Sequence, residues 1–125
     1  MKDDTLYLIH IGECIERVET YIGEGGKDAF MASTLTQDAV LRNLQTLAES
    51  TQRLSQAAQS VYPDIEWRRI AGFRNVLVHD YLGVDLERVW LIVERDLPEL
   101  KRVISAMLQE RGYEESGRAA EDSAP

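Results

Sequence analysis

The sequence is poor in the residues that build disulfides and metal sites. It has one cysteine, Cys14, so no disulfide can form within the chain, and its two histidines are not grouped at the spacing of metal ligands. No apolar run approaches the roughly 20 residues that a membrane-spanning helix needs, and the acidic start at 1–4 does not resemble a signal peptide. These absences predict a soluble cytoplasmic protein with no bound metal, no cofactor and no membrane contact.

Basic residues are also fewer than acidic ones. The chain has 14 lysines and arginines against 22 aspartates and glutamates, which gives a net charge of −8. Nucleic-acid phosphates are attracted to basic surfaces, so the overall charge disfavours general nucleic-acid binding. Any contact with RNA must therefore come from a local basic site. The densest basic stretch is 67–74, which contains Arg68, Arg69 and Arg74 and no acidic residue.

The apolar residues repeat at the spacing of helices. A chain of 125 residues suits one domain. Steps of three and four residues predict a first helix that Asp4 or Thr5 caps and that ends at Gly23. Its apolar face consists of Leu8, Ile11, Ile15, Val18 and Ile22. A short helical turn is expected over 27–32.

A second, longer helix is expected over 34–61. Thr34 and Gln37 have the spacing of a capping box at its start, and Pro63 is expected to stop it. Its apolar face consists of Val40, Leu44, Leu47, Thr51, Leu54, Ala58 and Val61. The main use expected for such a stripe is packing within the chain, although part of it can also join two copies.

Two further helices complete the expected fold. Asp64 is predicted to cap a third helix that runs to about Val78, and Asp85 a fourth, which Pro98 kinks or restarts. No segment alternates with the period of a strand. We therefore predict an all-α antiparallel bundle of four to five helices with no sheet, over residues 1–111. The polar segment 112–125 has no periodicity and is predicted to be a disordered acidic tail.

One polar group stands out near the end of the third helix. Arg74, Asn75, His79 and Tyr81 lie within eight residues. At about 100° per residue, Asn75 and His79 share a helix face, whereas Arg74 and His79 are separated by roughly 140°. Arg74 and His79 can meet only if the helix opens near His79 or if a second chain supplies one of them.

These residue types suit cleavage of RNA without a metal. Histidine exchanges protons near neutral pH, so His79 can take a proton from the ribose 2′-hydroxyl or give one to the leaving oxygen. Arg74 can stabilise the charge that builds on the phosphate oxygens. Asn75 can orient the imidazole or bind a phosphate oxygen. The simpler interpretation is a structural ion pair, such as His79 with Asp80 or Arg74 with Glu66.

The wider sequence resembles a known family. The pattern Arg74-x-x-x-x-His79-x-Tyr81 resembles the signature of the HepT branch of the HEPN superfamily. The resemblance extends over about 4–108. It includes Pro63-x-Ile65-x-Trp67 before the motif and the later segments Val84-Asp85 and Asp96-Leu97-Pro98.

The resemblance implies a function and partners. HepT proteins are dimeric, metal-independent ribonuclease toxins, and Arg74 and His79 match their catalytic pair, with Asn75 in support. Their antitoxin is a minimal nucleotidyltransferase, MntA, which transfers AMP to the motif tyrosine, here Tyr81. AMP there would add bulk and negative charge where an RNA phosphate must lie. The alternative interpretation of Tyr81 is a tyrosine that packs in an interface and forms a hydrogen bond through its hydroxyl.

Two functions remain open at this point. The first is a ribonuclease toxin acting on RNA such as tRNA or mRNA, as a homodimer or within a larger assembly with the antitoxin. Arg68 and Arg69 then extend the RNA-binding surface, although both can equally be solvated helix surface. The second is a non-catalytic scaffold for a nucleotidyltransferase partner, which the acidic charge favours. Trp67 and Trp90 are expected in the core or an interface, and His10 is expected to be structural.

Overall fold

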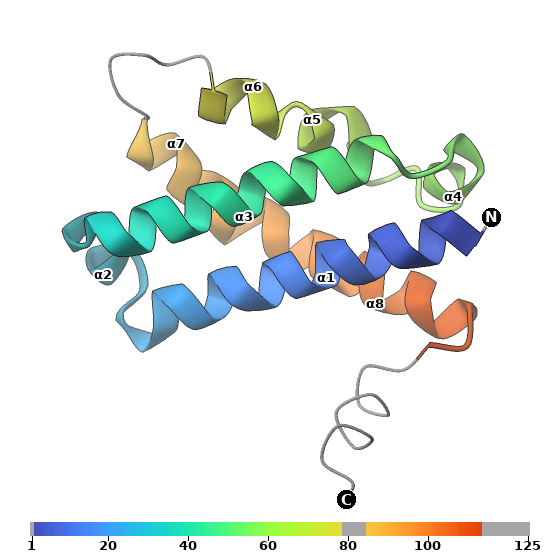
Figure 1. Cartoon of the computed structure of the whole chain (residues 1–125), viewed down its shortest axis with the longest axis horizontal. Coiled ribbons are helices and arrows are strands. Elements are labelled where there is room, and N and C mark those ends of the chain that lie inside the picture. Colours follow the sequence, from blue (N-terminus) through green and yellow to red (C-terminus); the bar gives the residue numbers. More distant parts are fainter. Residues whose placement is uncertain (1, 79–84, 114–125) are drawn as a thin grey trace, which may run out of the picture.

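Two long helices lie side by side and form the centre of the fold. The computed structural model describes residues 2–78 and 85–113. α1 (Lys2–Ile22) packs against α3 (Thr34–Gln52) and against α8 (Leu97–Glu110). α5 (Trp67–Ala71) and α6 (Phe73–Val78) pack against α3, on the side away from α1 (Figure 1). No strand occurs in the described part of the chain, so the predicted all-α fold class is confirmed.

The connection from α1 to α3 is tight. A 3-10 turn (Gly23–Gly25) leads into α2 (Gly26–Ala32), the short helical segment that the sequence predicted over 27–32. Gly23 and Gly26 have φ angles of 63° and 61°, which favour glycine over residues with a side chain. The predicted capping box is wrong. Ser33 is the N-cap of α3 and accepts a hydrogen bond from the Thr36 amide, because it has the extended backbone that a cap requires.

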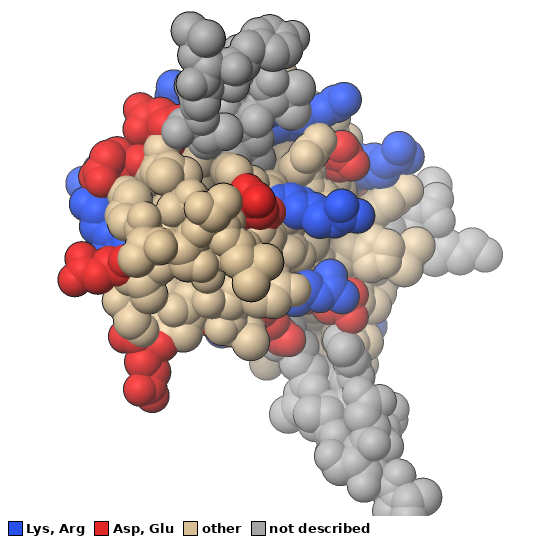
Figure 2. All heavy atoms as spheres, turned by 60° about the vertical axis from the view of Figure 1, so that its left-hand side comes forward, with Lys and Arg blue, Asp and Glu red and all other residues tan. Residues whose placement is uncertain are grey.

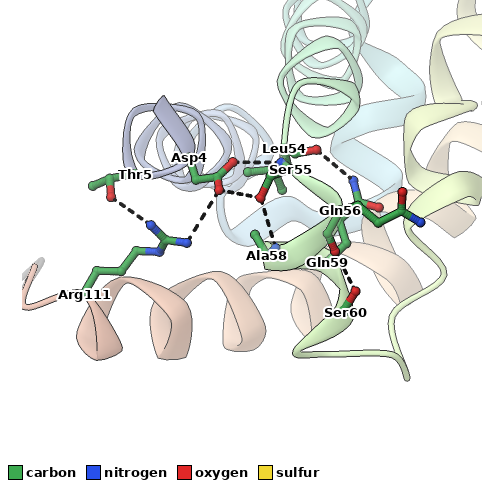
Figure 3. Close-up of polar contacts among 9 residues, drawn as sticks. All are labelled: Asp4, Thr5, Leu54, Ser55, Gln56, Ala58, Gln59, Ser60 and Arg111. Atoms are coloured by element: carbon green, nitrogen blue, oxygen red, sulfur yellow. Dashed lines mark hydrogen bonds and ion pairs between the residues drawn. The ribbon is translucent and has the colours of Figure 1, made fainter. Parts of the chain in front are cut away.

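The second long helix is shorter than predicted. It ends at Gln52, and α4 (Gln56–Ser60) begins after a break. The cause lies in α1, where Asp4 is a buried helical residue and not the predicted cap. The Ser55 amide donates to Asp4 Oδ1 at 2.8 Å and the Ser55 hydroxyl donates to Oδ2 at 2.6 Å (Figure 3). Ser55 also caps α4, so the helix restarts in a new register and Val61 is exposed.

The third predicted helix is also divided. A single turn residue, Gly72, separates α5 from α6. Asp64 does not cap α5, because the residue before the helix is Glu66 and no side chain caps the helix there. Trp67, Ile70 and Phe73 are buried, so the predicted apolar face is correct although the helix is interrupted.

The fourth helix follows the sequence more closely. Asp85 caps α7 (Leu86–Leu91) by accepting from the Arg88 amide at 3.2 Å. Near Pro98, which cannot donate a backbone hydrogen bond, the chain changes to a π-helical segment (Ile92–Asp96) before α8. The predicted irregularity at this proline is therefore confirmed.

The core lies where α1, α3 and α8 meet. Its fully buried side chains include Leu8, Ile15, Leu44, Leu47, Leu100 and Ile104. Phe30 of α2 extends this core to Trp90 of α7, with ring centres 5.6 Å apart. None of the described helices is long and apolar enough to cross a membrane. At the C-terminal end of α8, Gly112 (φ 83°) lets the Tyr113 amide donate back to the Leu108 carbonyl. The predicted division into a domain and a tail stays a prediction.

Candidate functional site

The described part of the predicted site lies in the first turn of α6. Arg74 and Asn75 are both exposed there. Arg74 makes no ion pair or hydrogen bond through its side chain to any described residue, so the proposed pairing with Glu66 does not occur. His79 and Tyr81 lie outside the described residues. Their predicted roles therefore stay predictions.

The two helices before and around Arg74 are firmly attached to the bundle. Buried Trp67 donates its indole N–H to the carbonyls of Gln59 and Tyr62, each at 3.0 Å. Gln52 of α3 donates to the Ala71 carbonyl at 3.2 Å. Phe73, directly before Arg74, is only 2% exposed. Because its neighbour is fixed in the core, the Arg74 guanidinium projects from an anchored position.

The other two predicted basic residues differ in their surroundings. Arg68 is exposed and has no ion pair among the described residues. Arg69 pairs with Asp96, with Nη2 3.3 Å from Oδ2, and the Arg69 side chain remains 57% exposed. An exposed pair at this distance is weak, so Arg69 keeps most of its capacity to bind a phosphate.

A groove beside α6 brings in a basic residue that the sequence did not reveal. It has a volume of about 320 Å³ and lies between α5–α6 and α7. Its lining consists of Arg69, Gly72, Phe73, Arg88, Leu91 and Ile92. Arg88 follows Arg69 by 19 positions and lies beyond the predicted motif, so only the packing of α7 shows that the two share a groove.

A second hollow adjoins the groove at Arg69 and has the opposite charge. It has a volume of about 240 Å³. Its lining consists of Asp64, Ile65, Glu66, Arg69, Ile70, Asp96 and Glu99. Basic and acidic side chains are likewise unevenly distributed over the face shown in Figure 2, where acidic groups predominate toward the left. The acidic excess of the chain is thus not spread uniformly.

The remaining candidate residues have structural surroundings. His10 is exposed on α1 and its ring makes an edge contact with Tyr7. Trp67 is buried, and Trp90 is half-buried and packs on Phe30, so both indoles contribute to the packing of the bundle, as expected. Among the described residues, no three His, Cys, Asp or Glu side chains lie together in a group that would hold a metal ion.

Comparisons with known proteins agree on one family. A family model for HepT-like ribonucleases matches residues 11–107. A probable ribonuclease HepT of Thermococcus cleftensis is 36% identical over 95 residues, which cover 76% of this chain and 86% of that protein. A putative RNase of Caldanaerobacter subterraneus is 31% identical over 110 residues, 87% of this chain and 97% of that protein.

A longer archaeal protein also matches. It is a gamma-glutamylcyclotransferase and putative RNase of Methanocaldococcus jannaschii, 37% identical over 109 residues. The match covers 87% of this chain and 49% of that protein, so the chain spans about half the length of this relative. No solved structure matches the chain.

Proposed function

The chain belongs to the HepT-like ribonuclease family, and on this basis we propose that it is a metal-independent endoribonuclease that uses Arg74 and His79. The observation that carries the proposal is the state of Arg74. In a chain with a net charge of −8, this guanidinium is exposed on an anchored helix and has no acidic partner among the described residues. A cation in that position is available to an RNA phosphate.

The proposed reaction needs only groups of the protein and the RNA. His79 takes the proton of a ribose 2′-hydroxyl, and the 2′-oxygen forms a bond to the adjacent phosphorus. The bond from phosphorus to the 5′-oxygen breaks, and that oxygen leaves with a proton from a second acid, for which the partner copy's imidazole is suited. Arg74 stabilises the negative charge on the non-bridging oxygens. The products are a 2′,3′-cyclic phosphate and a 5′-hydroxyl end.

The proposal extends to assembly and control. The protein acts as a homodimer and as the toxin of a toxin–antitoxin pair. Its antitoxin is an MntA-like nucleotidyltransferase that transfers AMP to Tyr81. The added phosphate would repel the RNA backbone two residues from His79. The net charge of −8 favours a second candidate, a non-catalytic scaffold for the same partner.

A growth assay tests the nuclease proposal. Induced wild-type chain is expected to stop growth, and His79→Ala is expected to have no effect on growth. His10→Ala is the matched control, because His10 is exposed on α1 and contacts only Tyr7 among the described rings. Equal toxicity of the wild type and His79→Ala would exclude His79 chemistry. Absence of toxicity from all three would support the scaffold.

The same assay, with the nucleotidyltransferase co-expressed, tests the control mechanism. The partner is expected to restore growth to cells that express the wild type but not to cells that express Tyr81→Phe, because phenylalanine has no hydroxyl to accept AMP. Intact-mass measurement should show an AMP addition in the first protein and none in the second. Neutralisation of Tyr81→Phe by the partner would contradict AMP transfer to this tyrosine.

A further inference from the structure

We propose that the groove between α5–α6 and α7 binds a nucleotide next to the scissile phosphate, and that Arg88 holds a phosphate of that nucleotide. This inference rests on the proposed ribonuclease function and names the RNA-binding site that would serve it. The groove begins at Phe73, directly before Arg74, and ends at α7 and the following π-helical segment. It is therefore continuous with the helix turn that carries the proposed catalytic arginine.

The first support is the charge of the groove. Arg69 from α5 and Arg88 from α7 both line it, and none of the described lining residues is acidic. The Arg88 side chain is exposed and has no ion pair among the described residues, whereas 22 carboxylate residues are available in the chain. Two guanidinium groups that line one groove from different helices suit the oxygens of a phosphodiester.

The second support is the apolar part of the lining. Phe73 and Ile92 are 2% and 4% exposed, and Leu91 is 41% exposed. A ribose or base can pack on the exposed part of Leu91 while its phosphate contacts the arginines, and Phe73 and Ile92 line the groove as almost fully buried side chains. The volume of about 320 Å³ is at the lower end of the roughly 300–1,000 Å³ of small-molecule sites, which suits a single nucleotide.

The acidic hollow next to the groove disfavours one of the two paths that an RNA backbone could take from Arg69. Four of its lining residues, Asp64, Glu66, Asp96 and Glu99, are acidic. An RNA backbone on that side of Arg69 would meet like charge, and on the other side it would meet Arg88. The favourable path from Arg74 therefore passes over α7 and away from the start of α8.

The test measures binding and cleavage separately. Binding of a labelled single-stranded RNA is measured by fluorescence anisotropy in the His79→Ala background, which prevents cleavage. Adding Arg88→Ala is expected to raise Kd roughly fivefold. The slope of log Kd against the logarithm of the salt concentration should fall by about 0.7, because one phosphate contact is lost. Arg88→Lys should keep the salt dependence. The matched control is Arg102→Ala, an exposed arginine of α8 outside the groove, which should bind like the background.

Cleavage kinetics separate this inference from the function on which it rests. With His79 intact, Arg88→Ala should raise KM with little change in kcat, because the contact is made equally in the ground state and the transition state. If the wild type cleaves RNA and Arg88→Ala binds and cleaves like Arg102→Ala, the groove proposal is wrong and the nuclease proposal stands. If the wild type does not cleave but Arg88→Ala still weakens binding, the groove binds RNA and the nuclease proposal fails.

Discussion

At the scale of single residues, Asp4 links segments that lie far apart in the sequence. Its carboxylate is 3% exposed and joins three distant parts of the chain. It accepts both hydrogen bonds from Ser55, and Arg111 near the end of α8 lies 3.7 Å from Oδ2. Figure 3 shows this carboxylate between the start of α4 and Arg111. One side chain thus fixes the first turn of α1 to the break after α3 and to the end of α8.

The surroundings of Asp4 also set its ionisation. Burial by itself would raise the pKa of this carboxyl, but the two hydrogen bonds from Ser55 and the Arg111 charge together lower the pKa below its ordinary value of 3.8. Because the folded pKa is the lower one, the stabilisation is complete above pH 3.8. It is lost as the pH falls through the folded pKa.

Asp4→Asn is expected to lower the free energy of unfolding by about 2 kcal/mol at pH 7, because the charged acceptor of two hydrogen bonds is lost. Urea unfolding followed by circular dichroism measures the loss. The difference from the wild type should stay constant down to about pH 5 and shrink as the pH falls below 3.8 toward the lower folded pKa of the wild-type carboxyl.

Asp38→Asn is the matched control for this prediction. Asp38 is exposed on α3 and makes no hydrogen bond or ion pair among the described residues. Its substitution should change stability by less than about 0.5 kcal/mol. A loss in Asp4→Asn that matches this control, or one that persists undiminished in acid, would show that the ionised carboxylate does not hold these segments together.

At the scale of elements, the start of α3 distinguishes two ways of capping a helix. The Ser33 hydroxyl accepts from the Thr36 amide at 3.1 Å. Gln37, which a capping box would turn back to the cap, instead donates to the carbonyls of Phe30 and Met31 at 3.0 and 3.1 Å. The glutamine therefore ties α3 to the end of α2 and makes the short loop part of the packed structure.

Ser33→Ala is expected to destabilise the protein by about 1 kcal/mol, because the Thr36 amide loses its acceptor. Thr34→Ala should change stability by less than about 0.5 kcal/mol, since Thr34 is exposed and does not cap the helix. Thermal and urea unfolding of the two variants provide the comparison. A larger loss of unfolding free energy in Thr34→Ala than in Ser33→Ala would support the capping box that the sequence suggested.

The elements show how much of the fold the sequence could predict. Apolar periodicity located α1, α7 and α8, because the core-facing residues repeat within each helix. It could not locate the end of α3 at Gln52, since the cause is a hydrogen bond to Asp4, 51 positions from Ser55. Thr51 before the break, Leu54 within it and Ala58 after it are all buried, so the apolar pattern continues where the helix does not.

The candidate site, like the fold, could be predicted only in part from the sequence. Arg74 was recognisable because the motif is local, and its exposure on α6 agrees with a binding role. Arg88 was not, because its position beside Arg69 and Phe73 follows from how α7 packs. Arg69 was predicted as a basic contact, but its ion pair with Asp96 depends on a residue 27 positions away.

At the scale of the whole molecule, α6 bears on how a complete site could form. The helix runs from Phe73 to Val78, and Arg74 is exposed in its first turn. Residues five apart on a regular helix differ by roughly 140° in direction. A two-fold pairing of chains brings the same surface of both copies together, and so it can place Arg74 of one copy near the imidazole of the other.

Mixing two inactive variants tests this arrangement. Arg74→Ala and His79→Ala are each expected to be inactive alone. After they are unfolded together and refolded in equal amounts, half of the dimers contain one chain of each kind. Every mixed dimer then holds one Arg74 and one His79 on different chains, with water left to protonate the leaving oxygen in place of the second imidazole. The mixture should therefore regain measurable cleavage, at no more than about a quarter of the wild-type rate. A mixture as inactive as its components, with mixed dimers demonstrated by mass spectrometry, would place each pair within a single chain. The chain beyond Val78 would then have to turn His79 back toward Arg74, and the second copy would contribute no residue to that pair.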